Sequence, residues 1–465
     1  KRFIEFFNFE PAIWHSGISS KDKKISWRGV VENKIKAVVG ARSSLFLPFS
    51  NLGIIIVDEE HDSSYKQDEG VMYNARDMAI SRASFEKIPI NLVTSIPSVE
   101  TFNNINNKKY SISFLKNRYK DASLPKIEII NLNLKKISKQ NWISQEIEDK
   151  VLKHLDKGDQ VLFFLNRRGY APSVICKNCH LKFLCPNCSV NINYHKVKNV
   201  LLCHYCGFKS SLTRKCKNSN NCDFIFCGPG VERIAEELKI KFPNKKISIF
   251  SSDTLKNKNS RDLINKIENK EIDILVGTQL ISKGYHFAKL NCIVVIDADF
   301  NSHGYDLRSA EKNIQLYHQL IGRAGREGSE AIVYFQSHTP NDEMLKYISN
   351  KNTHIFLSKE IELRKKNKLP PFFRFISLIV TGKNDKILEI EATKLKVYLS
   401  RHLKEEILGP VNAPIFRINR KFRYRLLIRV PKENVIQKKL SLIIGKIKFG
   451  SGIKLTVDVD PISFN

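Results

Sequence analysis

Short apolar runs, each followed at once by a polar or glycine-containing loop, recur through residues 1–300. Continuous apolar runs rich in β-branched residues are typical of strands buried on both faces of a parallel sheet. In such sheets the functional residues gather in the loops at the carboxyl ends of the strands. The runs that predict strands lie at 35–39, 53–57, 89–93, 160–165, 272–276 and 292–296.

Helix-like stretches at 231–242 and 309–320 lie between or after these runs, and the alternation predicts α/β lobes. After about Ser349 the pattern changes to that of a small α+β domain. Its expected strands are 374–380, 424–430 and 454–459, and its expected helices are 385–399 and 433–446.

A chain of 465 residues is too long for one core, so several domains are expected. We expect two α/β lobes, the first of them incomplete, with a cysteine-rich insertion early in the second. The predicted boundaries are 1–117 for the first lobe, 118–172 and 229–348 for the second, 173–228 for the insertion and 349–465 for the last domain.

The net charge of +30 favours a nucleic-acid partner. An AT-rich genome, which also writes Lys, Asn and Ile, is the competing explanation for this composition. No apolar run approaches the roughly 20 residues of a membrane span, and no signal peptide is visible, so a cytoplasmic protein with reduced cysteines is expected. The first residue is Lys1, not Met, which suggests a fragment.

Nine of the ten cysteines lie between Cys176 and Cys227. Two thiolates of a Cys-x-x-Cys turn can reach one tetrahedral ion, so four half-sites would form two closed zinc sites. The expected ligands are the three pairs Cys176/Cys179, Cys185/Cys188 and Cys203/Cys206, followed by Cys216 and Cys222.

An acidic motif that includes Asp58, Glu59 and His61 follows one predicted strand. An aspartate there can hold Mg²⁺, and the next glutamate can polarise the water that attacks a nucleoside triphosphate. A solvated acidic loop is the alternative. Far along the chain, Gln319 precedes Arg323 and Arg326, whose spacing lets two guanidinium groups point at a triphosphate. The two motifs together favour nucleotide chemistry with ATP and Mg²⁺ as the cofactors.

Several loops have the composition of nucleic-acid contacts. Backbone N–H and hydroxyl groups of glycine-containing loops can bind phosphates, and aromatic residues beside basic ones can stack on bases. No Gly-x-x-x-x-Gly-Lys-Ser/Thr phosphate loop occurs in the sequence. The candidate nucleic-acid contacts are Arg42, Ser43, Tyr65, Lys66, Tyr73, Arg167, Arg168, Gly277, Thr278 and Gln279.

These motifs resemble the PriA family of replication-restart helicases, also called primosomal protein N′, a superfamily-two group. The cysteine cluster between two sets of helicase motifs is the specific element. The resemblance implies two RecA-like helicase lobes and ATP-driven 3′-to-5′ unwinding at abandoned forks. It also implies single-stranded and duplex DNA, primosome proteins and single-stranded DNA-binding protein as partners, and loading of the replicative helicase. The segments that carry it are 42–46, 58–67, 166–170, 277–279, 306–311 and 319–326.

The resemblance also assigns roles. Asp58 and Glu59 would be the Mg²⁺-binding and water-activating acids, and Arg323 and Arg326 the arginine fingers. The ligands of the two zinc ions would alternate along the chain. One ion would be held by Cys176, Cys179, Cys216 and a fourth ligand, and the other by Cys185, Cys188, Cys203 and Cys206.

Some positions depart from the family pattern. The family's amino-terminal DNA-binding region and phosphate loop are absent. Ile96 stands where a hydroxyl is usual, and Tyr285 where histidine is usual. Ser219 occupies the eighth cysteine position, so Cys222 is the expected replacement, with Cys227 as the alternative.

Two other functions compete with a motor. A non-hydrolysing DNA-binding factor that assembles the primosome would fit the missing phosphate loop and Ile96, but the retained Asp58, Glu59, Arg323 and Arg326 oppose it. An unrelated zinc-ribbon RNA-binding protein would explain neither the acidic motif nor the arginine pair.

Metal analysis of the purified chain should find two zinc ions per chain, because eight cysteine ligands are expected. One ion per chain would show that Cys222 does not complete the set that contains Cys216.

Overall fold

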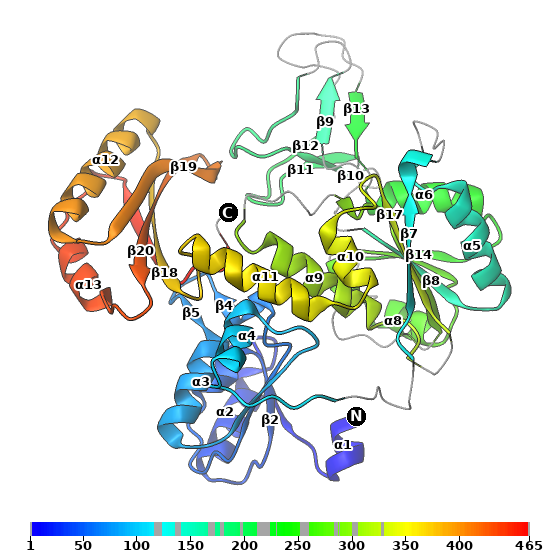
Figure 1. Ribbon diagram of the computed structural model, residues 1–465, viewed down its shortest axis with the longest axis horizontal. Helices are drawn as coiled ribbons and strands as arrows, with labels where there is room; N and C mark the ends of the chain where they lie inside the picture. Colours follow the sequence, from blue (N-terminus) through cyan, green and yellow to red (C-terminus); the bar gives the residue numbers. More distant parts are fainter. Residues whose placement is uncertain are drawn as a thin grey trace. The chain divides into compact units, whose positions relative to one another are not determined.

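The computed structural model describes residues 2–115, 123–134, 141–165, 173–176, 181–195, 199–211, 224–228, 230–251, 260–282, 287, 289–299, 306–326 and 330–463. These residues form two compact units, Lys1–Ser98 and Val99–Asn465, and each unit is described by itself. Figure 1 gives the element labels used below.

The first unit contains two pairs of parallel strands and one hairpin. Strand β1 pairs with β2, β3 pairs with β6, and the antiparallel strands β4 and β5 form the hairpin. The strands are β1 (Ala12–Trp14), β2 (Val38–Gly40), β3 (Ile55–Asp58), β4 (Lys66–Gln67), β5 (Tyr73–Asn74) and β6 (Ile90–Val93). The helices are α1 (Arg2–Phe7), α2 (Ser20–Val31), η1 (Arg42–Phe46), η2 (Ser63–Tyr65) and α3 (Ala75–Glu86).

One face of the β3–β6 pair is open. Val57 is buried, whereas Ile56 is 63% exposed and Val93 is 43% exposed. The expectation that these strands are buried on both faces is therefore wrong in this unit. Helix α3 is a neighbour of β3, yet the face that carries Ile56 stays exposed. The side chain of Asp58 lies on that open face, since it alternates with Val57.

The second unit is built on a sheet of six parallel strands in the order β14-β15-β8-β16-β17-β7. Three of them, β8, β15 and β16, are buried at every position, as the apolar runs predict. The strands are β7 (Lys126–Asn131), β8 (Gln160–Phe164), β14 (Ile247–Phe250), β15 (Ile274–Gly277), β16 (Leu290–Val295) and β17 (Ile332–Ser337).

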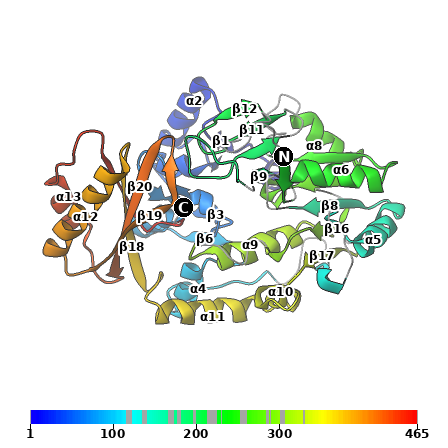
Figure 2. The same ribbon diagram turned by 90° about the horizontal axis from the view of Figure 1, so that it is seen from above.

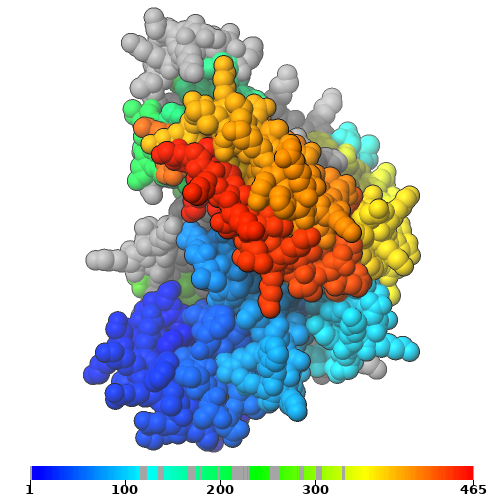
Figure 3. Space-filling view, turned by 90° about the vertical axis from the view of Figure 1, so that its left-hand side faces the viewer, coloured from blue at the N-terminus to red at the C-terminus, as the bar shows by residue number. Residues whose placement is uncertain are grey.

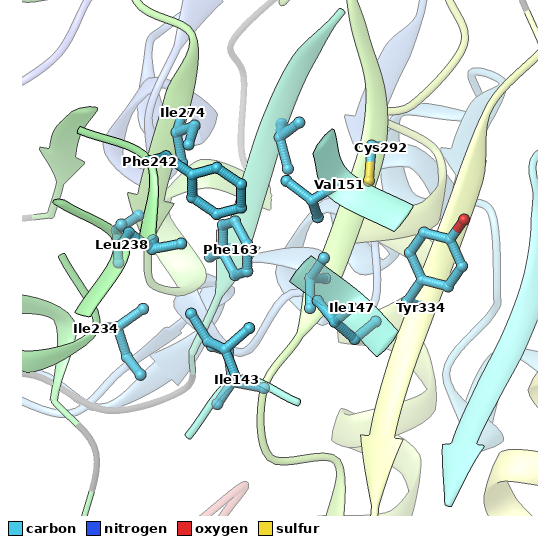
Figure 4. Close-up of a cluster of buried hydrophobic side chains, with 14 of the residues drawn as sticks. Ile143, Ile147, Val151, Phe163, Ile234, Leu238, Phe242, Ile274, Cys292 and Tyr334 are labelled. Atoms are coloured by element: carbon cyan, nitrogen blue, oxygen red, sulfur yellow. The ribbon is translucent and has the colours of Figure 1, made fainter. Parts of the chain in front are cut away.

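Helices lie on both sides of this sheet (Figures 1 and 2). Helices α5 (Gln145–Asp156) and α6 (Val231–Lys241) pack on one face, where Ile147 and Leu238 meet Phe163 (Figure 4). On the other face, Tyr317 of α9 (Ser309–Ile321) contacts Phe335, with ring centroids 5.2 Å apart. The remaining helical elements are α4 (Val99–Asn106), η4 (Leu132–Leu134), α8 (Ser260–Glu268), η5 (Gln279–Ser282), α10 (Glu343–Ser349) and α11 (Thr353–Lys366).

The cysteine-rich insertion has a very small apolar core, made of Val174, Ile192, Tyr194 and Leu201 with a few partly buried neighbours. A core of this size does not stabilise a fold without help, and a metal ion is a common source of that help. The strands are β9 (Ser173–Cys176), which pairs with β13 (Phe224–Cys227), and the antiparallel set β10 (Asn193–His195), β11 (Val200–Leu202) and β12 (Lys209–Ser211).

The last part of the chain is the expected α+β domain, an antiparallel sheet in the order β19-β20-β18-β21. Helices α12 and α13 pack on one face of it through residues such as Leu388 and Leu440, and Figure 3 looks onto these helices. The elements are β18 (Phe373–Gly382), α12 (Asp385–His402), β19 (Glu406–Ile418), β20 (Lys421–Pro431), α13 (Gln437–Gly445) and β21 (Lys454–Val459).

The long strand β19 was not expected from the sequence, which places a break at Leu408-Gly409-Pro410. The structure carries the strand through this point, because its register against β20 shifts between Leu408 and Val411. A bulge of this kind accommodates a proline that lacks an N–H donor.

No helix among the described residues is both long and apolar enough to cross a membrane.

Candidate functional site

The acidic motif begins at the end of β3. Asp58 is the last residue of the strand and is exposed, and Glu59 follows with a φ of 50°. That left-handed conformation turns the chain sharply after the strand. The backbone N–H of Glu60 then donates to the carbonyl of Val93 at 3.1 Å, which ties the motif to the neighbouring strand β6. The exposed Asp58 carboxylate is therefore presented at a fixed strand end.

Glu60 fixes this motif in place through buried hydrogen bonds, a role that its sequence position does not indicate. The residue is 1% exposed. Its carboxylate accepts from the backbone N–H of Ser98 at 2.6 Å, from the Ser98 hydroxyl at 3.0 Å and from Arg76 Nη1 at 3.0 Å. A buried carboxylate needs such donors to offset the loss of water. The interaction fixes the segment 94–98 against the acidic motif.

His61 contacts the same segment. Its Nδ1 lies 2.6 Å from Thr94 Oγ1, and Thr94 Oγ1 donates to the carbonyl of Ile96 at 2.7 Å. Because the Thr94 proton is used in that bond, His61 Nδ1 is the donor to Thr94. The Ile96 side chain is buried, at 1% exposure. The hydroxyls of Thr94 and Ser98 on either side of Ile96 thus connect this segment to the acidic motif.

The predicted nucleic-acid residues of the first unit are linked to the same strand end. The Tyr65 hydroxyl donates to the carbonyl of Asp58 at 2.5 Å, and Arg42 Nη1 donates to the carbonyl of Lys66 at 2.7 Å. Burial, followed by the nearby acidic groups, raises the pKa of Tyr65 to about 12, so its hydroxyl remains a donor. Lys66 is 6% exposed, and Tyr73 packs edge-on against Phe46. Ser43 lies exposed in η1.

In the second unit, Gly277 ends β15 and is followed by the buried Thr278 and the exposed Gln279. A Cβ at Gly277 would lie 2.9 Å from the Ile281 side chain, so the close turn into η5 requires glycine. The Gly277 carbonyl accepts from the N–H of Leu165 at 2.9 Å. This places the phosphate-type loop next to the end of the central strand β8.

The arginine pair lies in the turn that follows α9, and not within the helix. Gln319 is in the last turn of the helix, and Arg323 N donates to the Leu320 carbonyl at 3.0 Å. Arg323 is 9% exposed, and Arg326 Nε donates to the Gly322 carbonyl at 3.1 Å. Cations are favourable at the carboxyl end of a helix, where the backbone carbonyls carry partial negative charge.

A buried ion network holds the other end of α9. Arg308 donates to Glu100 at 2.5 and 3.0 Å and to Glu311 at 3.3 Å. Arg364 of α11 also donates to Glu311, at 2.9 Å, and Glu311 accepts from the backbone N–H of Val99. Although burial acts to lower it, the carboxylates of Glu100 and Glu311 raise the pKa of Arg308. The network joins α4, α9 and α11.

Four cysteines meet in the insertion. The Sγ atoms of Cys185, Cys188, Cys203 and Cys206 all lie within 4.8 Å of one another, and those of Cys185 and Cys206 are 3.6 Å apart. Four thiolates about 2.3 Å from a tetrahedral zinc ion are spaced closely in this way. The donor set therefore fits zinc, and it joins the two Cys-x-x-Cys turns that were expected to share an ion.

The thiols of this cluster differ in acidity. Burial raises the pKa of Cys188 to about 12. Burial also acts on Cys206, but the N–H of Phe208 and the neighbouring thiols outweigh it and lower the pKa of Cys206 to about 7. Cys206 is therefore readier to deprotonate than Cys188, and a bound dication would favour the thiolate form of all four.

Part of the expected set lies outside the described residues, namely Arg167, Arg168, Cys179, Cys216, Ser219, Cys222 and Tyr285. Cys176 is described, as a buried residue of β9. The other expected zinc set, which includes Cys176, therefore stays a prediction.

Glu60→Gln should loosen residues 94–98, because it removes the charge that pairs with Arg76. Breaking a buried pair costs on the order of 3 kcal/mol, so amide exchange at Ser98, measured by mass spectrometry, should rise at least tenfold. Glu69→Gln, at an exposed glutamate, is the matched control. Equal exchange in both variants would contradict this role of Glu60.

Three family models match the chain. They are the primosomal protein N C-terminal domain at residues 365–462, the helicase conserved C-terminal domain at 208–328, and the Cys-rich region of the PriA DNA helicase at 185–210. A solved structure of RecG bound to a three-way DNA junction superposes with a TM-score of 0.39 at 15% identity, covering 75% of this chain and 35% of RecG. A superposition of that quality does not bear on function.

Curated relatives match along the whole chain. The replication restart protein PriA of Rickettsia felis is 45% identical over 466 residues, covering 100% of this chain and 72% of the relative. The protein of the same name from Bacillus subtilis is 32% identical over 467 residues, covering 99% of this chain and 58% of the relative. This identity extends over the whole chain, and the cysteine cluster lies in the matched Cys-rich region. The chain therefore belongs to the PriA family of replication restart helicases.

Proposed function

We propose that this chain provides the motor and zinc-binding parts of an ATP-dependent 3′-to-5′ DNA helicase that acts at stalled or abandoned replication forks. The similarity to replication restart proteins, which extends along the whole of this chain, carries the proposal. The proposed domain boundaries are those expected from the sequence pattern. Residues 1–117 belong to the first helicase lobe, residues 118–172 and 229–348 to the second, residues 173–228 to the zinc insertion, and residues 349–465 to the closing domain.

Asp58 and Glu59 act on the nucleotide in this proposal. Asp58 binds Mg²⁺, directly or through water, and Glu59 orients and polarises the attacking water. The exposure of Asp58 at a strand end supports this role, and so does the rigid support from Glu60 beneath it. His61 is hydrogen-bonded to Thr94, so a movement of the acidic motif is transmitted to the 94–98 segment.

Arg323 and Arg326 stabilise the charge that develops on the γ-phosphate, and Gln319 contacts the nucleotide beside them. A guanidinium group can do this only if its backbone is held in one place. Two features support the assignment: the N–H of Gly325 donates to the Leu290 carbonyl at 3.0 Å, and the Arg308 network fixes the start of α9. Mg²⁺ neutralises the phosphates when it is bound.

DNA contacts come from loops that adjoin these groups. Thr278 and Gln279 follow a strand end, as do Arg42 and Ser43, and loops of this kind bind phosphates. Tyr65 links the DNA-facing loop to the nucleotide-facing strand through its bond to the Asp58 carbonyl. The remaining contacts are Lys66, Tyr73, Arg167, Arg168 and Gly277.

The partners and metals complete the proposal. The insertion holds two zinc ions, one of them at Cys185, Cys188, Cys203 and Cys206. The chain acts on forked DNA with primosome proteins and single-stranded DNA-binding protein, and it promotes loading of the replicative helicase.

The chain should bind forked and single-stranded DNA with an affinity that falls as salt rises, because its excess of 30 positive charges releases counterions from DNA. The binding constant should be measured by fluorescence anisotropy between 50 and 200 mM salt. A plot of its logarithm against the logarithm of the salt concentration should have a slope of about −0.7 to −0.9 for each phosphate contact. Binding that does not change with salt would contradict the charge argument.

ATP hydrolysis tests the motor assignment. The 465-residue chain alone should show no DNA-stimulated hydrolysis, since it contains no phosphate loop, whereas the protein expressed from the whole of its gene should hydrolyse ATP when DNA is added. In the protein expressed from the whole gene, Arg323→Ala should lower the rate about 10³-fold or more. Arg401→Ala, at an exposed position in α12, should leave the rate unchanged.

Two results would contradict the motor. Equal rates in the Arg323 and Arg401 variants would remove Arg323 from the reaction. DNA binding without any hydrolysis by the protein expressed from the whole gene would support the non-hydrolysing assembly factor instead.

A further inference from the structure

The hairpin between β19 and β20 ends in a tight turn with an unusual residue. Asn419 and Arg420 connect the strands, with φ angles of 49° and 64°. A two-residue turn with two positive φ angles usually has asparagine followed by glycine. Arginine in the left-handed region costs about 1–2 kcal/mol. The contacts of Arg420 offer a reason for its presence.

The tip of this hairpin lies against the Cys185–Cys188 turn of the insertion, and β19 ends beside the insertion in Figure 1. The N–H of Arg420 donates to the Asn187 carbonyl at 2.7 Å, and its Nε donates to Asn187 Oδ1 at 2.8 Å. The N–H of Ser189 donates to the Arg417 carbonyl at 2.8 Å, and Arg417 Nη2 donates to the Pro186 carbonyl at 3.2 Å.

The tip also touches the metal-ligating sulfur atoms. The N–H of Asn419 donates to Cys188 Sγ at 3.3 Å, and Ile418 packs against the buried cluster of Cys185, Cys188 and Cys203. A donor aimed at a ligand atom fixes the orientation of that ligand and stabilises its charge. Within the insertion, the N–H of Asn187 is placed in a similar way, 3.4 Å from Cys185 Sγ, and the N–H of Phe208 acts on Cys206.

The charge of the site explains why basic residues suit this position. Four thiolates around one Zn²⁺ leave a net charge of about −2. The guanidinium groups of Arg417 and Arg420 reach over the same turn and offset part of it, while Ile418 excludes water. The hairpin tip therefore has the donors, the charge and the apolar cover that a metal site needs around its ligands.

We propose that residues Arg417–Arg420 form the outer shell of the Cys185/Cys188/Cys203/Cys206 zinc site, so that zinc binding and docking of the C-terminal domain on the insertion stabilise each other. By thermodynamic linkage, the factor by which docking tightens zinc equals the factor by which zinc tightens docking. Chelation or oxidation of this site releases the hairpin tip. The inference rests on zinc occupying this site and is independent of ATP hydrolysis.

The double variant Arg417→Ala/Arg420→Gly tests this in the full chain. Glycine removes the strain of the turn, so the hairpin itself should fold at least as well as before. Zinc release into an excess of a chromogenic chelator should be about 10–100-fold faster than in the unaltered chain, the usual effect of losing outer-shell partners. Arg429→Ala, which removes an arginine of β20 paired with Glu406 of β19, should release zinc at the unaltered rate.

If zinc leaves the chain in more than one kinetic phase, the phase that belongs to this site is the one that is missing in Cys188→Ser. The reverse coupling is measured by amide exchange in the unaltered chain. Zinc removal should raise exchange at Asn419 and Arg420, while Leu426 in the domain core stays protected. Unaltered zinc release in the double variant, or unchanged exchange at the tip after zinc removal, overturns the proposal. Full zinc content in Cys188→Ser would overturn its premise.

Discussion

Strands β8, β15 and β16 are buried at every position, and this burial decides where polar chemistry can lie in the second unit. A charged group inside such a strand would lose its water without gaining partners, at a cost of several kcal/mol. Polar residues are therefore confined to the strand ends, as Thr278 and Gln279 are after β15. Asp58 occupies a similar position in the first unit, as the last residue of β3.

Buried charges then fix the segments that leave these strands. Glu60 binds Ser98 and Arg76 beneath the acidic motif, and Arg308 binds Glu100 and Glu311 at the start of the helix that leads to the arginine pair. Both networks consist of ions with several hydrogen-bonding partners. Such networks are costly to break, because any remaining member stays buried without compensation. They give the functional loops defined positions on an otherwise apolar scaffold.

The sequence was informative wherever one local pattern determines the structure. Apolar runs predicted the buried strands, Cys-x-x-Cys spacing predicted paired metal half-sites, and the family resemblance indicated which two pairs meet around Cys188. It was uninformative where the partner is distant. Nothing local indicates that Glu60 will meet Ser98, or that Asn419 will donate to Cys188 across 231 positions. It was misleading at Gly409-Pro410, where a register shift carries β19 through a typical break signal, and at Ile56, which is exposed on an open sheet face.

In the proposed function, these strand-end groups and the zinc insertion serve an ATP-driven motor on forked DNA. The direct measurement is strand separation by the protein expressed from the whole of its gene. Duplexes with a 3′ single-stranded tail and with a 5′ tail should be compared, with and without ATP. The account predicts ATP-dependent separation of the 3′-tailed duplex. Failure to separate either duplex by protein that binds both and holds its zinc would contradict it.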